Sequence, residues 1–181
     1  MNIIREFCRF SASDAARATG VTAALQRDWR RRSYLPSLGG KHARFDAFVL
    51  SQLALARALS NRSIGPAKAQ EIVSRAAPTI VWNALINFPN LINVSGPKKY
   101  IERYSRRLEG SGDEFLKLAG ISEGLDVRFL VEFEDYLVMT AELDAVFKRS
   151  DSVVSFVIDL ESIARSLAAS IDGHLVTVRL E

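Results

Sequence analysis

The sequence predicts an α+β protein in three parts: an all-α domain over residues 1–78, a helical connector over 79–125 and an acidic α+β domain over 126–181. Three observations support this division. Through the first part, apolar residues recur every three or four positions, which is the period of a helix with one buried face. After Gly124 the period becomes two, as in a strand. Near Pro78, which ends a helical pattern, the net charge changes sign.

The two halves of the chain carry opposite net charges. Residues 1–78 contain 13 Lys and Arg against 5 Asp and Glu, whereas residues 79–181 contain 11 against 16. The first half therefore suits phosphates, and DNA would repel the second. The single cysteine, Cys8, allows no intrachain disulfide and no thiolate metal cluster, and it fits a reducing cytoplasm.

The first two predicted helices have helix-turn-helix spacing. Ser11 is the expected N-cap of the first helix, with Asp14 in capping-box position, and Gly20 can end that helix in a left-handed conformation. Thr22 can cap the second helix, which leaves a turn of three or four residues. The second helix has an apolar stripe for the core, formed by Val21, Leu25 and Trp29. Its arginines point elsewhere.

The remaining elements follow from turn signals and periodicity. Residues 37–44 form a tight turn at Gly39-Gly40 and are a candidate wing. Further helices are predicted at 48–59, 63–77, 80–88, 97–109 and 113–118. The C-terminal third is predicted as β-β-β-α-β, with strands at 127–133, 137–147, 153–158 and 174–180, a helix at 160–171 and a hairpin turn at Glu134-Asp135.

The N-terminal segment contains a series of short motifs in chain order: Phe10-Ser11-x-x-Asp14, Ala15-Ala16-Arg17-x-Thr19-Gly20-Val21-Thr22, Arg27-x-Trp29, Leu35-Pro36, Arg44-Phe45, Leu50-x-x-Leu53 and Arg57-Ala58-Leu59. Together they resemble the MerR-type winged helix-turn-helix DNA-binding family, over about residues 9–75. The resemblance implies a recognition helix over residues 22–32 in the major groove, with Arg27 at the DNA-contacting arginine position. It also implies a wing over residues 41–44. The C-terminal part resembles no such family.

The chain departs from the family pattern at several positions. Gln26 stands at the usual leucine position, Arg30 at the acidic residue that follows the aromatic, and Ser33 at a glycine. The long dimerising helix should follow residue 78, but no sustained heptad pattern occurs there. The cysteines of the metal-sensing members are missing downstream, which argues against a metal-responsive regulator.

The candidate DNA-binding residues lie on the second helix and the wing: Thr22, Ala24, Gln26, Arg27, Arg30, Arg31, Lys41, His42 and Arg44. Arginine can bind guanine bidentately, and Gln26 either reads adenine or packs on the helix edge. The alternative for the arginines is a solvated helix face. A second basic set, on the helix at 97–109, either extends the footprint or is a solvated face: Lys98, Lys99, Arg103, Arg106 and Arg107.

The sequence thus predicts a sequence-specific transcriptional regulator of bacterial or prophage type that binds duplex DNA. We expect no enzyme activity and no cofactor, because no catalytic, phosphate-binding or metal-binding spacing is present. Because one module reads few base pairs, we expect a homodimer formed through the C-terminal part, with the apolar segment at 80–92 covered there. That segment is too short to span a membrane, and the expected location is cytoplasmic, on the nucleoid.

Two other hypotheses remain open. One is an architectural recombination factor, similar to the excisionases that share the winged helix. The other places the function in the C-terminal domain, as a small-molecule sensor or as a docking module for RNA polymerase or another regulator.

Overall fold

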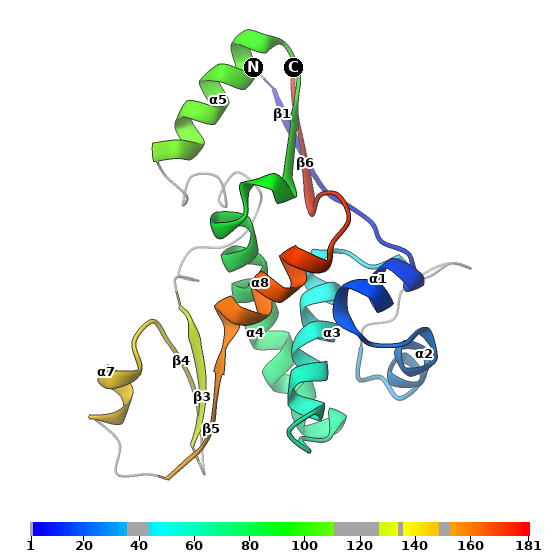
Figure 1. Ribbon diagram of the computed structural model, residues 1–181, viewed down its shortest axis with the longest axis vertical. Helices are drawn as coiled ribbons and strands as arrows, with labels where there is room; N and C mark the ends of the chain where they lie inside the picture. Colours follow the sequence, from blue (N-terminus) through cyan, green and yellow to red (C-terminus); the bar gives the residue numbers. More distant parts are fainter. Residues whose placement is uncertain (1, 36–43, 111–126, 134–135, 149–152) are drawn as a thin grey trace.

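The computed structural model describes residues 2–35, 44–110, 127–133, 136–148 and 153–181. Over these residues the chain is a mixed α+β protein with seven α-helices and two three-stranded sheets. Helices α3 (Ala47–Ser60), α4 (Pro66–Asn87) and α8 (Leu160–Ser170) lie in the middle of the molecule, whereas α1 (Ala12–Thr19) and α2 (Ala23–Arg31) lie beside them towards one edge (Figure 1). The two sheets lie at different ends of the molecule.

The two sheets differ in strand direction. In the first, β6 (Val176–Leu180) lies between β1 (Ile3–Phe7), to which it is antiparallel, and β2 (Ile92–Ser95), to which it is parallel. In the second, β3 (Phe129–Phe133) lies between β4 (Leu137–Thr140) and β5 (Val154–Asp159), both antiparallel. The remaining elements are the 3-10 turn η1 (Pro89–Leu91), α5 (Lys98–Gly110) and α7 (Leu143–Phe147).

The prediction of an all-α N-terminal domain is wrong. Strand β1 precedes α1 and pairs with the C-terminal strand, with Ile3 opposite Leu180 and Phe7 opposite Val176. Its pattern is not a clean alternation, because Arg5 and Glu6 interrupt the apolar residues. The partner strand also lies at the other end of the chain, so no local window of sequence contains the pairing.

The predicted single C-terminal β-β-β-α-β sheet is also wrong. Strands β3, β4 and β5 form one sheet, but β6 leaves it and joins β1 and β2. The strand predicted over 137–147 ends at Thr140, and residues Leu143–Phe147 are helical. The Thr140 hydroxyl accepts a hydrogen bond from the Glu142 backbone N–H at 3.2 Å and donates to the Glu142 carbonyl at 2.9 Å, which turns the chain at this point.

Helix α4 passes through the position where the sequence predicts a break. Pro78 lies inside it, and the helix continues to Asn87. A proline in a helix removes the N–H that would bond to the carbonyl four residues earlier. That carbonyl belongs to Ser74, which is exposed, so water can replace the missing donor. Burial of Ala76, Ala77 and Ile80 on both sides of the proline favours the unbroken helix.

One buried cluster connects the N-terminal helices to the C-terminal helix. Helix α8 packs on α4, α3 and α1. Its buried residues are Leu160, Ala164, Leu167 and Ala168. The predicted domain boundary at residue 78 therefore lies within a helix that α8 covers.

The apolar segment at 80–92 is covered within the chain, contrary to the expectation that a second copy covers it. Its large hydrophobic residues are buried, except for Ile86, which is 39% exposed, and for Phe88 and Ile92, which are half-buried. Of the helices in the described ranges, none is both long enough and apolar enough to cross a membrane.

Candidate nucleic-acid interface

The turn between α1 and α2 is fixed by caps at both helix ends. Ser11 and Asp14 form the predicted capping box at the start of α1. Gly20 ends the helix in the left-handed conformation, with φ 69°, and its N–H donates to the carbonyl of Ala16 at 2.9 Å. The Thr22 hydroxyl then accepts from the backbone N–H of Leu25 at 3.3 Å and starts α2. These local signals place the end of α1 and the start of α2 where the sequence predicts them.

The inner side of α2 packs against α1. Val21 and Trp29 are buried, as expected, and Leu25 is half-buried. Gln26 is also fully buried. Its side-chain amide donates to the carbonyl oxygens of Val21 at 2.8 Å and Ala12 at 3.1 Å.

The position of Gln26 agrees with the packing alternative and not with the adenine-reading one. Its amide hydrogens are already donated to backbone carbonyls of α1 and of the turn. A side chain with no exposed surface in this arrangement cannot reach a base edge. We therefore leave Gln26 out of the candidate interface.

Arg30 lies between the inner and outer sides of α2. Its guanidinium carbon is 5.6 Å from the ring centroid of Phe45, within range for a cation–π contact. Its Nε donates to the carbonyl of Gln26 at 3.3 Å. The half-buried Arg30 thus covers a core aromatic residue and keeps its remaining N–H groups for other partners.

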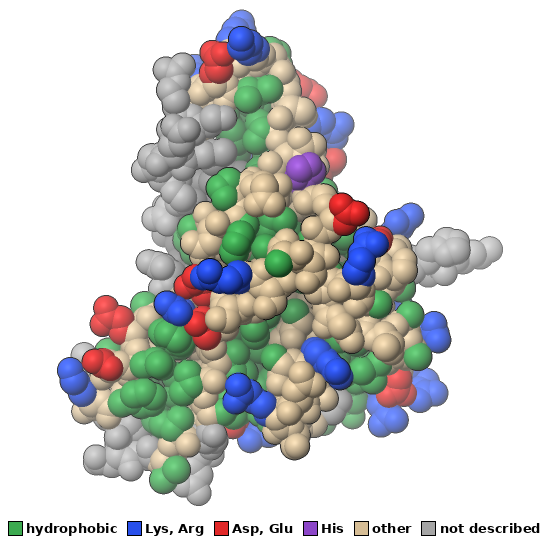
Figure 2. All heavy atoms as spheres, in the orientation of Figure 1, with side chains coloured by type: hydrophobic (Ala, Val, Ile, Leu, Met, Phe, Trp, Pro, Cys, Tyr) green, Lys and Arg blue, Asp and Glu red, His purple; other side chains and the backbone are tan. Residues whose placement is uncertain are grey.

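The outer side of α2 faces solvent at the edge of the molecule (Figure 1). The exposed candidates on and just before this helix are Thr22, Ala24, Arg27 and Arg31. Figure 2 shows Lys and Arg side chains gathered at this edge, with acidic side chains among them. Within the described part of the chain, Arg27 has no ion pair or hydrogen bond through its side chain, so its guanidinium is available to an outside anion.

Asp28 partly neutralises this surface. Its carboxylate forms ion pairs with Arg31, three residues on, and with Arg32, four residues on, where the Nε to oxygen distance is 3.0 Å. Partial burial by itself raises the pKa of Asp28, but hydrogen bonds and charges from Arg32 and Arg31 outweigh it, and the pKa is lowered. The sequence analysis missed these ion pairs of Asp28. The spacing indicates them, because Arg31 and Arg32 follow Asp28 by three and four residues on the same helix.

Of the predicted wing residues, Lys41 and His42 lie outside the described residues. Arg44 is described and exposed. It lies next to Phe45, which exchanges two backbone hydrogen bonds with Phe10 at 2.8 and 2.9 Å. This pair connects the segment just before α1 to the segment just before α3.

The Arg44 charge also reaches α1. Hydrogen bonds from the Ser11 side chain and backbone lower the pKa of Asp14, and the charges of Arg17 and Arg44 lower it further. Arg17 is exposed and pairs with Asp14 at 3.1 Å. Arg17 and Arg44 are thus two further exposed cations close to the start of α1.

The second basic set is far from this surface. Helix α5 lies at the top of the view in Figure 1, whereas α2 lies lower down at its right edge. Lys98 is 4.0 Å from Glu102, and the Lys99 ammonium lies over the Tyr100 ring at 4.8 Å. These contacts agree with the solvated-face alternative. The side chains of Arg106 and Arg107 lie outside the described residues.

No metal centre is formed by the described residues, among which no three His, Cys, Asp or Glu side chains are grouped to hold an ion. Cys8 is a half-buried free thiol whose sulfur lies 3.5 Å from the Thr177 hydroxyl. A scan against models of known protein families and a search of curated proteins both gave no match.

Proposed function

We propose that this protein is a transcriptional regulator that binds a specific duplex DNA site through α2. The observation that carries the proposal is the outer face of α2, where exposed cations stand at the edge of the molecule and Arg27 has no partner among the described residues. A helix with its side chains is about 10–12 Å across, and the major groove of DNA is about 12 Å wide. An uncovered helix of nine residues with a cationic face suits that groove.

The same face contains groups for two kinds of contact. Arg27 and Arg31 can donate bidentately to guanine in the groove, whereas Thr22 and Arg44, at its margins, suit phosphate oxygens. Ala24 offers a methyl group for apolar contact with thymine. Phosphate contacts set the register of the protein and base contacts specify the sequence.

The MerR-type resemblance adds to this proposal. It rests on the motifs between Phe10 and Leu59, and the capped turn between α1 and α2 at Gly20 is compatible with a helix-turn-helix. In such a fold the loop between α2 and Phe45 is the wing.

We further propose that the functional unit is a homodimer, because a single module contacts too few base pairs for useful specificity. The edge strands β4 and β5, and the large hydrophobic residues left exposed beside them, are the candidate surfaces for the second copy. Those residues are Tyr136, Phe147 and Val153.

The test begins with selection of binding sites from a random duplex library by the full chain. The dissociation constant for the selected duplex is then measured over a range of salt concentrations. Arg27→Ala is expected to weaken binding by about 1–3 kcal/mol and to relax the preference at one base pair, or to lower the salt slope by about 1 if Arg27 contacts a phosphate. Arg165→Ala, at an exposed arginine of α8, is the matched control and should bind like the wild type.

Two results would contradict the proposal. In the first, no sequence is enriched over the starting library. In the second, Arg27→Ala and Arg165→Ala change the affinity and its salt dependence equally, which would place the DNA contact elsewhere on the basic half of the chain.

A further inference from the structure

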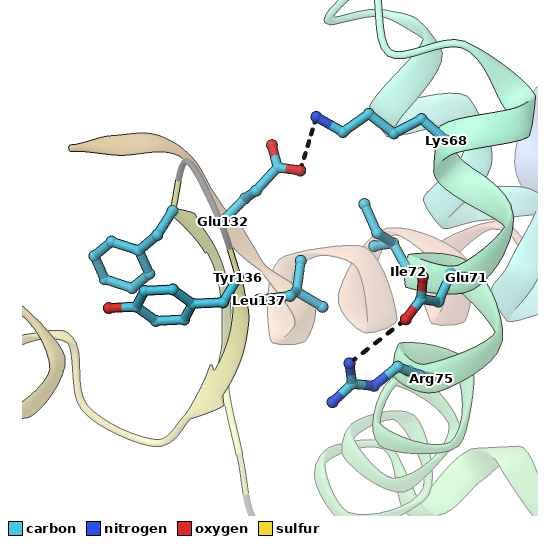
Figure 3. Close-up of a pocket in the computed structure, with 8 residues that line it drawn as sticks. Lys68, Glu71, Ile72, Arg75, Glu132, Tyr136 and Leu137 are labelled. Carbon is cyan, nitrogen blue, oxygen red and sulfur yellow. Dashed lines mark ion pairs between the residues drawn. The ribbon is translucent and has the colours of Figure 1, made fainter. Parts of the chain in front are cut away.

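A pocket of about 440 Å³ lies between α4 and the hairpin formed by β3 and β4 (Figure 3). This volume lies within the roughly 300–1,000 Å³ of small-molecule sites. Residues of α4 form one wall and residues of the hairpin form the other. The pocket is lined by Lys68, Glu71, Ile72, Arg75, Glu132, Phe133, Tyr136 and Leu137.

The α4 wall is one face of the helix. Lys68, Ile72 and Arg75 are spaced i, i+4 and i+7, so their side chains stand in a row along about 10 Å of helix. Ile72, in the middle of the row, is buried, and the half-buried Leu137 of the hairpin points towards it across the pocket (Figure 3). The pocket therefore has an apolar middle with a cation at each end.

The two cations differ in how closely an acidic side chain of the protein pairs with them. The Lys68 ammonium is 2.9 Å from a carboxylate oxygen of Glu132, whose side chain is only 12% exposed. The Arg75 guanidinium is 3.9 Å from Glu71, beyond hydrogen-bond distance, and the Glu71 side chain is 83% exposed. In the described part of the chain Arg75 has no other partner, so its N–H donors remain available.

We infer that this pocket binds a small aromatic monocarboxylate. The carboxylate accepts two parallel hydrogen bonds from the Arg75 guanidinium, which matches it in shape and charge. The planar apolar body lies between Ile72 and Leu137 and is removed from water there. A second anionic group would approach Glu132 at the other end, so the pocket selects against dicarboxylates.

The pocket connects the two halves of the chain. Helix α4 packs on α3, which belongs to the basic half, whereas the hairpin belongs to the acidic half. A ligand that contacts both walls stabilises their present arrangement, because it binds the folded pocket and not the unfolded chain. The binding itself does not depend on the proposed DNA contact, so it is tested on the full chain without DNA.

The experiment measures thermal stability against ligand concentration with three probes: benzoate, its neutral amide benzamide, and the dicarboxylate terephthalate. Benzoate is expected to raise Tm progressively up to about 10 mM, since a solvent-open site of this size binds weakly. Benzamide and terephthalate are expected to raise it much less. For Arg75→Gln, the dissociation constant of benzoate should rise about tenfold, since the charge-assisted pair is lost.

Arg165→Gln is the matched control, because Arg165 also pairs with a glutamate four residues away on an exposed helix face, at 2.7 Å from Glu161. It should retain the benzoate response of the wild type. The inference is overturned if benzoate fails to stabilise the wild type. It is also overturned if benzamide or terephthalate does so equally, or if Arg75→Gln responds like Arg165→Gln.

Discussion

The side-chain amide of Gln26 donates a hydrogen bond to the backbone carbonyl of Val21 at 2.8 Å, five residues earlier and just before the N-cap of α2. A second hydrogen bond from the same nitrogen reaches Ala12 in the first turn of α1. One buried side chain thus joins both helices of the helix-turn-helix, at the position where the sequence suggested contact with a base.

Gln26→Ala is expected to destabilise the fold and leave the DNA sequence preference unchanged. Truncation removes two hydrogen bonds and leaves a buried carbonyl at Val21 without a donor, which costs about 1–3 kcal/mol in the free energy of unfolding. Urea denaturation measures the cost. Gln52→Ala, on α3, is the control and should stay within about 0.5 kcal/mol of the wild type. Unchanged stability together with an altered base preference would mean that Gln26 contacts DNA.

Asp28→Asn is expected to tighten DNA binding if the proposed interface is correct. The substitution releases Arg31 and Arg32 from their ion pairs, and both become available to phosphates. We expect the dissociation constant to fall about two- to fivefold, with a steeper dependence on salt, because an exposed pair is worth less than about 1 kcal/mol. Fluorescence anisotropy with a labelled duplex measures both quantities.

The control for that experiment is Asp172→Asn, which removes an equal charge from an exposed turn before β6. An equal gain in affinity in both variants would mean that net charge, and not the α2 surface, determines binding.

Local signals in the sequence predict the elements around the candidate site well. Capping residues act within one turn of a helix, so Ser11, Gly20 and Thr22 specify their helix ends without help from the rest of the chain. The apolar pattern that predicts a helix over 48–59 is likewise local, and α3 spans Ala47–Ser60.

The elements that sequence reasoning missed depend on distant partners. Gln26 is buried because α1 presents the Ala12 carbonyl to it, which no pattern within α2 reveals. Strand β1 exists because β6 supplies its hydrogen bonds from the other end of the chain. Pro78 is a strong helix breaker locally, but the packing of α4 on α3 and α8 overrides it.

Substitution by alanine should destabilise the protein to different extents at two glycines that have a positive φ. A Cβ at Gly96, where φ is 144°, would lie 2.5 Å from the carbonyl oxygen of Leu180, so backbone must shift between β2 and β6. At Gly20, where φ is 69°, no atom lies within 4 Å of the added carbon. We expect Gly20→Ala to cost about 1 kcal/mol and Gly96→Ala about 3 kcal/mol or more, measured by urea denaturation. Equal costs in the free energy of unfolding would show that the backbone at the end of β2 shifts without a large penalty.

The pH dependence of stability can be tested at Asp159, the N-cap of α8. Its carboxylate accepts from the Ser162 backbone N–H at 3.1 Å and from the Arg128 guanidinium at 2.8 Å. Partial burial raises the pKa of Asp159, but these hydrogen bonds and the Arg128 charge outweigh it, so the pKa lies below its ordinary 3.8. The stabilisation is therefore complete above the pKa of the unfolded chain and is lost as the pH falls through the lower pKa of the folded state.

Asp159→Asn keeps an N-cap and removes the charge, whereas Asp159→Ala removes both. Above about pH 5 we expect the asparagine variant to be less stable than the wild type by up to about 1 kcal/mol and the alanine variant by about 1–2 kcal/mol. As the pH falls towards about 2, the difference between wild type and asparagine variant should shrink, because the wild-type carboxylate becomes protonated. Urea denaturation at a series of pH values measures this, and a difference that stays constant with pH would show that the Arg128 pair contributes nothing.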